Sequence, residues 1–138
     1  MNKLSSSYLF NKSAHNGGRA ASSEAHWVPN TDVYVTESGV VIKVELAGMR
    51  KEDLELTVES NRLKISGHRP DGCRPAKCCF QLMEINYGSF ESLIELPGGF
   101  DLAQARATYQ NGFLRIDVPV AKAPKRKPVS VPVSSAEK

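Results

Sequence analysis

Three thiols in the middle of the chain have the widest potential chemistry of any of its side chains. Cys73, Cys78 and Cys79 fall in one short stretch, and an odd, crowded set is a poor framework for disulfides within one chain. A zinc site would need two Cys-x-x-Cys or Cys/His pairs, whereas His68 and Cys73 each stand alone before the adjacent pair. The sequence therefore predicts no metal site. Two roles for the thiols stay open: reduced thiols in an exposed loop, or redox-sensing or interchain disulfide chemistry.

The three histidines offer no recognisable catalytic centre. His15, His26 and His68 lie in or beside predicted loops, and no Ser, Cys or carboxylate stands at a catalytic spacing from them. A triad assembled by the fold stays open at this stage, but nothing in the pattern favours one. We therefore expect a protein that acts by binding, without a cofactor, rather than by catalysis.

The basic residues near the C-terminus raise the question of nucleic-acid binding. The chain has 138 residues, with 18 basic and 15 acidic ones, and four of the basic ones lie close together: Lys122, Lys125, Arg126 and Lys127. Clustered Lys and Arg attract phosphates, but no aromatic platform is interleaved with this run. The run is typical of a solvated linker, so we expect no nucleic-acid partner.

The apolar runs are too short to cross a membrane. The longest candidate, Val40 to Leu46, is interrupted by Lys43 and Glu45, whereas a spanning helix needs about 18 apolar residues or more. The N-terminal run Tyr8-Leu9-Phe10 is far shorter than the apolar region of a signal peptide, about 7–15 residues. These patterns predict a cytoplasmic protein with no membrane partner.

The two ends of the chain differ in composition from its middle. Residues 1–26 are rich in Ser, Asn, Gly and Ala without a sustained period, which predicts a disordered arm. Residues 121–138 contain three prolines in a Lys/Ser/Val background, which suits a flexible, extended tail. Each arm nevertheless holds apolar residues that could contact a partner: Leu4, Tyr8, Leu9 and Phe10 in the first, and Val129, Val131 and Val133 in the second. Valines one residue apart point the same way on an extended strand.

Residues 27–120 must supply the folded part, and their alternation of apolar and polar residues predicts β-strands. The sequence predicts three hairpins: Val33–Val35 with Val40–Leu46 around Ser38-Gly39, Leu54–Val58 with Leu63–Ser66 around Ser60-Asn61, and Ala107–Tyr109 with Leu114–Val118 around Asn111-Gly112. The Asn-Gly pair is a strong signal for a type I′ turn. Further strand candidates surround Phe80, Leu82, Phe90, Ile94 and Leu96.

The spacing of these strands predicts the fold class. There are seven or more short strands with turns between them, and the only helix-like stretch is Asp101 to Ala105. A chain of this length favours a single domain. We therefore expect one all-β domain over residues 27–120, an immunoglobulin-like antiparallel β-sandwich between two flexible arms.

Several short motifs follow one another along these strands. They are Leu46-Ala47-Gly48 followed by Lys51-Glu52-Asp53-Leu54, Asn61–Gly67 with an L-x-I-x-G strand, Glu84 with Tyr87-Gly88-Ser89-Phe90, Leu96-Pro97, and Ala107–Leu114 with A-x-x-x-N-G-x-L. Each motif is weak alone, but together their order and spacing resemble the α-crystallin domain of small heat-shock proteins, of the bacterial and plant type. Three positions depart from the family pattern, because Ala47 replaces a proline and Ile85 and Ser92 replace arginines. Contacts made by those two arginines are therefore not expected here.

The resemblance implies an ATP-independent holdase, a stress-response chaperone that binds partly unfolded proteins and prevents their aggregation. It implies a dimer in which Phe80 to Asn86, with Phe80, Leu82 and Glu84 as its dimer residues, adds a strand to the neighbouring subunit. The alternative for this segment is a strand within its own sandwich. The apolar cluster of the N-terminal arm would bind clients.

The resemblance also implies larger homo-oligomers. The tail valines would dock into a groove between two strands, lined by Leu54, Leu56, Val58, Ala107 and Tyr109, although the tail could also be a simple disordered end. Which overlapping Val-x-Val pair docks stays open, but Pro132 lacks the N–H that Ser130 keeps. Two rival functions remain: a monomeric co-chaperone-like or adaptor sandwich that binds a folded partner, and an enzyme built on a sandwich, which would need clustered polar loops.

Overall fold

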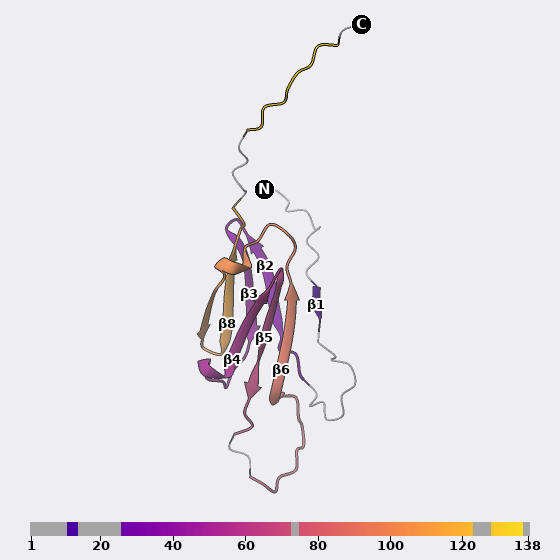
Figure 1. Ribbon diagram of the computed structural model, residues 1–138. Coiled ribbons are helices and arrows are strands. Elements are labelled where there is room, and N and C mark those ends of the chain that lie inside the picture. The colour runs from indigo at the N-terminus through magenta and orange to yellow at the C-terminus, as the bar shows by residue number, and fades with distance from the viewer. Residues whose placement is uncertain (1–10, 14–25, 73–74, 123–127, 137–138) are drawn as a thin grey trace.

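The computed structural model describes residues 11–13, 26–72, 75–122 and 128–136. In these ranges the chain forms two four-stranded antiparallel sheets that face each other (Figure 1). Helical structure within them is confined to two short 3-10 turns, η1 (Lys51–Asp53) and η2 (Leu102–Gln104). No helix in the described part of the chain is long and apolar enough to cross a membrane. The predicted all-β sandwich is confirmed.

The two sheets have simple strand orders. The first is β1-β6-β5-β4 and the second is β2-β3-β8-β7. The strands are β1 (Asn11–Ser13), β2 (Thr31–Thr36), β3 (Gly39–Glu45), β4 (Leu54–Glu59), β5 (Arg62–Arg69), β6 (Gly88–Glu95), β7 (Arg106–Gln110) and β8 (Phe113–Pro119). Strand β1 lies in the segment expected to be a disordered arm and pairs with β6, a pairing that the sequence pattern did not indicate.

The three predicted hairpins are present. Asn111 and Gly112 have φ angles of 53° and 81°, the left-handed backbone that a type I′ turn requires at both positions. Ser60-Asn61 forms the turn between β4 and β5 as expected. The first turn is Glu37-Ser38, one residue earlier than predicted, because Gly39 already pairs with the last residue of β2.

The inward faces of both sheets form one hydrophobic core. Its buried members are Val40, Ile42, Val44, Leu46, Leu63, Ile65, Phe90, Ile94, Leu96, Leu102, Leu114, Ile116 and Val118. Along β5, β6 and β8 they alternate with more exposed neighbours, as a strand with one buried face requires. On the central strand β3, Val41 on the other face is buried as well. The period-2 pattern in the sequence thus reports the direction in which each side chain points.

Gly67 on β5 marks the closest approach of the backbone to the core. A Cβ at this position would lie 2.4 Å from the carbonyl oxygen of Asp53 and 2.7 Å from the ring of Phe90. No side chain fits there without a shift of its neighbours. This close packing is the physical reason for the glycine that ends the L-x-I-x-G motif, although the strand itself continues to Arg69.

Ser92 is the buried polar exception among the described core residues. Its side chain is fully buried on β6, and its Oγ has no hydrogen-bond partner. Because Ser92 points inward between Phe90 and Ile94, an arginine at this position would place a charge between the two sheets. With serine in place of that arginine, the core holds a small, uncharged side chain at this position.

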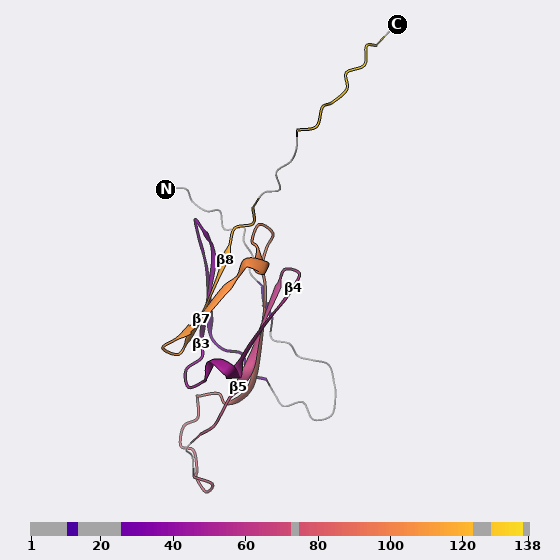
Figure 2. The same cartoon turned by 60° about the vertical axis from the view of Figure 1, so that its left-hand side comes forward.

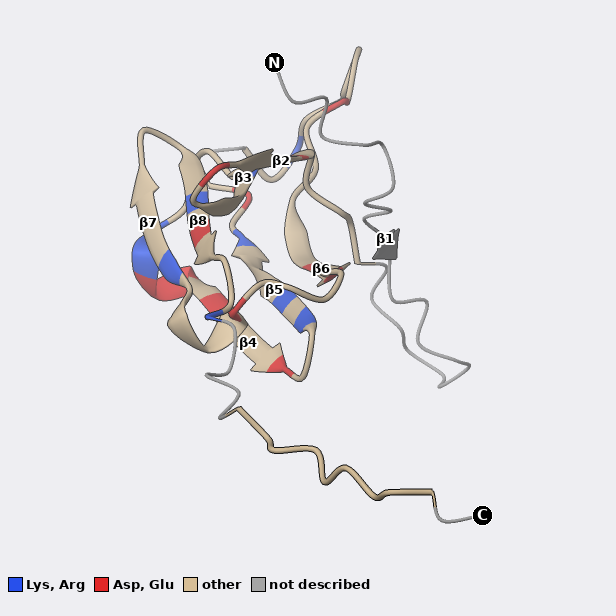
Figure 3. Ribbon diagram, turned by 90° about the horizontal axis from the view of Figure 1, so that it is seen from above, with Lys and Arg blue, Asp and Glu red and all other residues tan. Residues whose placement is uncertain are grey.

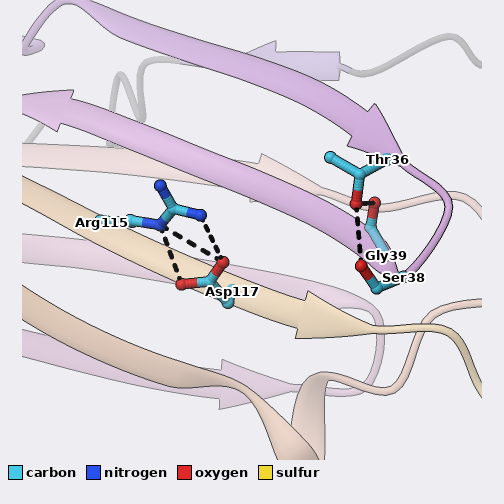
Figure 4. Close-up of polar contacts among 5 residues, drawn as sticks. All are labelled: Thr36, Ser38, Gly39, Arg115 and Asp117. Carbon is cyan, nitrogen blue, oxygen red and sulfur yellow. Dashed lines mark hydrogen bonds and ion pairs between the residues drawn. The ribbon is translucent and has the colours of Figure 1, made fainter.

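The outer faces of the sheets carry charged residues, with Tyr34, Val41 and Phe113 as apolar residues of the second sheet. Acidic and basic residues occur along β4 and β5 (Figure 3), and Lys64 on β5 pairs with Glu91 on β6 at 3.7 Å. On β8, Arg115 and Asp117 form an ion pair with Nη2 and Oδ1 3.0 Å apart. At the last residue of β2, the Thr36 hydroxyl contacts the Ser38 hydroxyl and the Gly39 carbonyl (Figure 4). Exposed pairs of this kind contribute little stability. The most exposed large apolar side chains of the described chain lie in the long connection after β5 and in the C-terminal tail.

Candidate interaction site

One edge of the sandwich exposes side chains that point toward the core. Strand β4 ends the first sheet and β7 ends the second, and Figure 2 shows the sandwich turned so that this side comes forward. Leu56 is paired with Ile65 and Val58 with Leu63. Because Ile65 and Leu63 are buried, the two residues of β4 also point inward, yet they are 36% and 44% exposed.

The facing strand β7 has the same arrangement. Ala107 is paired with Ile116 and Tyr109 with Leu114, which are both core residues. Ala107 therefore also faces inward and is exposed. We call the set Leu54, Leu56, Val58, Ala107 and Tyr109 the open edge. All five positions predicted to accept the tail thus lie on the inward faces of the two end strands. Leu56, Val58 and Ala107 are exposed there, whereas Leu54 and Tyr109 are partly buried against the core.

Two polar contacts fix the strands of the open edge. The hydroxyl of Tyr109 donates to the carbonyl of Leu46, which ties β7 to the end of β3. Before β4, the Arg50 guanidinium and backbone N–H both donate to the Asp53 carboxylate. The side-chain hydrogen bond from Arg50 holds the pKa of Asp53 below its usual range. Both strands therefore start or end at an anchored point.

The tail valines are far more exposed than any core residue. Val129, Val131 and Val133 are 85%, 78% and 96% exposed, and residues 128–136 form no strand. In Figure 1 this segment runs away from the sandwich. The described tail is therefore not bound to the open edge of its own chain.

The long connection between β5 and β6 is the second exposed apolar segment. Residues 75–87 contribute no strand to either sheet of the chain. Leu82, Met83 and Ile85 are 74%, 60% and 59% exposed, and Phe80 is 44% exposed, while Glu84 is also exposed. The predicted dimer strand thus lies outside the sandwich of its own chain, and its pairing partner must come from elsewhere if it forms a strand.

Both ends of this connection are tied down by Arg69, a residue that the sequence reasoning missed. The Arg69 guanidinium donates from Nε to the Asn86 carbonyl at 2.7 Å and from Nη1 to the Ala47 carbonyl at 3.3 Å. It stacks over the ring of Trp27, with Cζ 4.3 Å from the centroid, and faces Tyr87 at 5.9 Å. The only sequence signal is an arginine at the end of a strand, directly before a long connection.

Trp27 joins the start of the sandwich to the same place. Its backbone pairs with β6 on either side of Phe90, and its indole N–H donates to the Gly88 carbonyl at 3.1 Å. Its ring packs against Phe90 with centroids 5.1 Å apart. We call Trp27, Arg69 and Tyr87 the arginine clamp. The clamp fixes where the N-terminal segment enters the sandwich and where the long connection leaves it.

The remaining predicted site residues are only partly described. Leu4, Tyr8, Leu9, Phe10 and Cys73 lie outside the described residues. Cys78 and Cys79 are free and exposed. His68 lies on the outer face of β5, with its Nδ1 3.4 Å from the Ser89 hydroxyl. Among the described residues no group of three or more His, Cys, Asp or Glu side chains could hold a metal ion.

Comparison with known proteins identifies the family of this chain. Residues 32–134 match the Hsp20/alpha crystallin family. This range includes β3 to β8, all of β2 but its first residue, the long connection and the tail valines, whereas β1 lies outside it. The chain belongs to this family. Small heat shock protein C2 of Rickettsia felis is 29% identical over 112 residues, covering 81% of this chain and 73% of the relative. Spore protein SP21 of Stigmatella aurantiaca is 32% identical over 110 residues, covering 80% of this chain and 64% of the relative.

Solved structures of family members share the sandwich. A small heat-shock protein from Xylella fastidiosa superposes with a TM-score of 0.67 at 28% identity, covering 79% of this chain and all of that chain. Heat shock protein 16.0 from Schizosaccharomyces pombe gives a TM-score of 0.64 at 25% identity, covering 86% and 91%. The family consists of small heat shock chaperones, whose members act on unfolded clients and form oligomers. The resemblance expected from the sequence motifs is confirmed.

Proposed function

We propose that this chain is an ATP-independent holdase of the cytoplasm, which binds partly unfolded proteins and prevents their aggregation. The observation that supports this best is the open edge, where the inward-facing Leu56, Val58 and Ala107 are exposed in the described chain. Monomeric soluble proteins rarely leave large contiguous apolar surface exposed. When another subunit covers such a surface, it holds the oligomer together. When that subunit dissociates, the surface can bind a client.

The proposed mechanism needs no catalytic group. Partly unfolded proteins expose apolar segments and unpaired strand edges, and these associate with one another unless another surface competes. A holdase that binds the unfolded state lowers the concentration of free aggregating chains by mass action. The apolar cluster of the N-terminal arm, Leu4, Tyr8, Leu9 and Phe10, would supply further client-binding surface.

The proposed dimer uses the long connection. Phe80–Asn86 would pair with the free edge of β2 in a neighbouring subunit, because β2 ends the second sheet and its outer edge has no partner strand among the described residues. Strand addition would remove two unpaired edges at once. It would also bury Leu82, the most exposed apolar side chain of the connection. The dimer would thus bury the segment that the single chain leaves exposed.

The proposed higher oligomer uses the tail. Two valines of the set Val129, Val131 and Val133 would dock on the open edge of a subunit in another dimer. Burying two such side chains contributes about 3–6 kcal/mol before ordering costs. Because ordering the tail removes much of this gain, each link would be weak, and subunits would exchange. Weak links let the same apolar edge become available to clients.

A direct test heats a labile enzyme such as citrate synthase with this protein, without ATP, and separates the soluble fraction by size. A holdase should keep the client in solution in large complexes that contain both proteins. A co-chaperone-like adaptor that binds a folded partner would stay monomeric, and the heated client would be lost to the pellet. That second result would contradict the proposal.

A further inference from the structure

Cys78 and Cys79 are two adjacent thiols with no part in the core, the open edge or the arginine clamp. Both are free and exposed on the long connection. Cys78 also lines a surface hollow of about 330 Å³ together with Asp71, Pro75, Ala76 and Phe80. The pair therefore has access to solvent and lies beside a space that can hold a small molecule. The proposed chaperone function does not account for it.

The adjacency of the two cysteines limits what they can form with each other. A trans peptide holds neighbouring Cα atoms about 3.8 Å apart, whereas an ordinary disulfide joins Cα atoms about 4.4–6.8 Å apart. A bond between Cys78 and Cys79 would therefore be strained and easily reduced. A sulfur partner from outside the pair relieves this constraint, because it is free to take the preferred geometry.

We propose that Cys78 and Cys79 form a modification site that takes up a small anionic thiol as a mixed disulfide. The thiolate of one cysteine attacks a sulfur of an oxidised low-molecular-weight thiol such as glutathione disulfide. The S–S bond of the reagent breaks as the new S–S bond forms, and the released thiolate takes up the proton that the cysteine lost. No other oxidant is needed, because the disulfide reagent is itself reduced.

One exposed cation lies directly beside the pair. Lys77 precedes Cys78 and is exposed, whereas Asp71 lies on the wall of the hollow. The positive charge of Lys77 attracts an anionic reagent to the adjacent thiols. Lys77→Gln should therefore slow modification by glutathione disulfide more than modification by cystamine, whose charge is positive.

Modification here has a consequence for assembly, which rests on the proposed dimer. Phe80 follows Cys79 directly, and Leu82 is 74% exposed in the single chain. An attached anionic tripeptide would bring bulk and charge to the start of the segment that must lose water in the dimer. The mixed disulfide therefore shifts the equilibrium from dimer toward monomer, and a reductant reverses the shift.

The first measurement is the intact mass of the reduced full-length protein after incubation with glutathione disulfide. We expect a gain of glutathionyl mass on the peptide that contains Cys78 and Cys79, removed by dithiothreitol and absent in the Cys78→Ser/Cys79→Ser variant. The Cys73→Ser variant should still be modified. A loss of two hydrogens without added glutathione, or modification confined to Cys73, would overturn the site.

The second measurement is the size of the same samples by light-scattering chromatography. We expect the modified protein to shift toward monomer and the serine double variant to keep its size under the same treatment. A modified protein that stays dimeric, while Leu82→Glu yields monomer, would refute the effect on assembly and leave the proposed dimer intact. A monomer before any modification would contradict the proposed dimer and the effect on it, while the mass measurement still decides the site.

Discussion

The guanidinium of Arg69 lies over the indole ring of Trp27, with Cζ 4.3 Å from the ring centroid. The same group binds the carbonyls of Asn86 and Ala47, so one cation joins the entry of the N-terminal segment, the connection and the end of β3. Arginine suits this place because its planar fork donates in several directions while its face stacks on a ring. The clamp therefore sets the direction of the long connection relative to the sandwich.

Replacing Arg69 by lysine should loosen the clamp without removing the charge. Trp27 is the only tryptophan of the chain, so its fluorescence reports on this contact directly. We expect a red-shifted emission, stronger quenching by acrylamide and a loss of about 1–2 kcal/mol in the free energy of unfolding. Arg62→Lys, on the outer face of β5, is the matched control. An unchanged spectrum in the Arg69→Lys protein would show that the stacking is not formed in solution.

Leu82→Glu should dissociate the proposed dimer. The substitution removes an apolar side chain worth about 2 kcal/mol when buried and adds a charge that would have to lose water. We expect at least a roughly 30-fold rise in the dimer dissociation constant, measured by sedimentation. Gln81→Glu adds the same charge to the neighbouring residue, which points the other way on an extended strand, and should have a smaller effect. Equal dimer stability in both variants would argue against this strand.

The double substitution Val129→Ala/Val131→Ala should reduce the number of subunits in the oligomer and leave the dimer intact. Each substitution removes two methyl groups from a docked side chain. Because the net binding free energy of each tail is small, this loss should release the tail. The sizing profile should move toward dimers at unchanged circular dichroism. Ser130→Ala, whose side chain points away from the valines, is the control. If Val133→Ala disrupts the profile and Val129→Ala does not, the second overlapping pair makes the link.

Gly67→Ala should destabilise the sandwich strongly for a single methyl group. The new Cβ would overlap with the Asp53 carbonyl and the Phe90 ring, and overpacking of this kind costs about 1–3 kcal/mol. For a domain of this size that corresponds to a fall in Tm of roughly 4 °C or more. Gly72→Ala is the matched control, because a Cβ added to Gly72 would meet no atom within 4 Å. Equal melting temperatures would contradict the packing at Gly67.

The fold could be predicted well because its information is local. Alternation along β5 and β8 follows from one buried face, and the turn type at Asn111-Gly112 follows from two residues that tolerate positive φ. The predicted turn Ser38-Gly39 lies one residue after the observed turn Glu37-Ser38. The two positions give similar patterns of apolar and polar residues in the flanking strands. These predictions depend on neighbours in the sequence and need no knowledge of distant contacts.

The candidate site was harder to predict because its contacts are long-range. The partners of Arg69 come from residues 27, 47, 86 and 87, and no local period indicates such a meeting. The residues of the open edge were named through the resemblance, and their shared inward direction emerged only from the register of β4 with β5 and of β7 with β8. Phe80–Asn86 has strand-like alternation but no strand in the described chain, since pairing needs a second edge.

The measurement that tests the central claim most directly is light scattering from a heat-aggregating client, followed with and without this protein in the absence of ATP. The proposed holdase should suppress scattering at an equimolar subunit ratio, with suppression increasing as the ratio rises. Bovine serum albumin at the same mass concentration serves as the control for a general protein effect. Scattering that remains unchanged at equimolar or higher subunit ratio would contradict the holdase function.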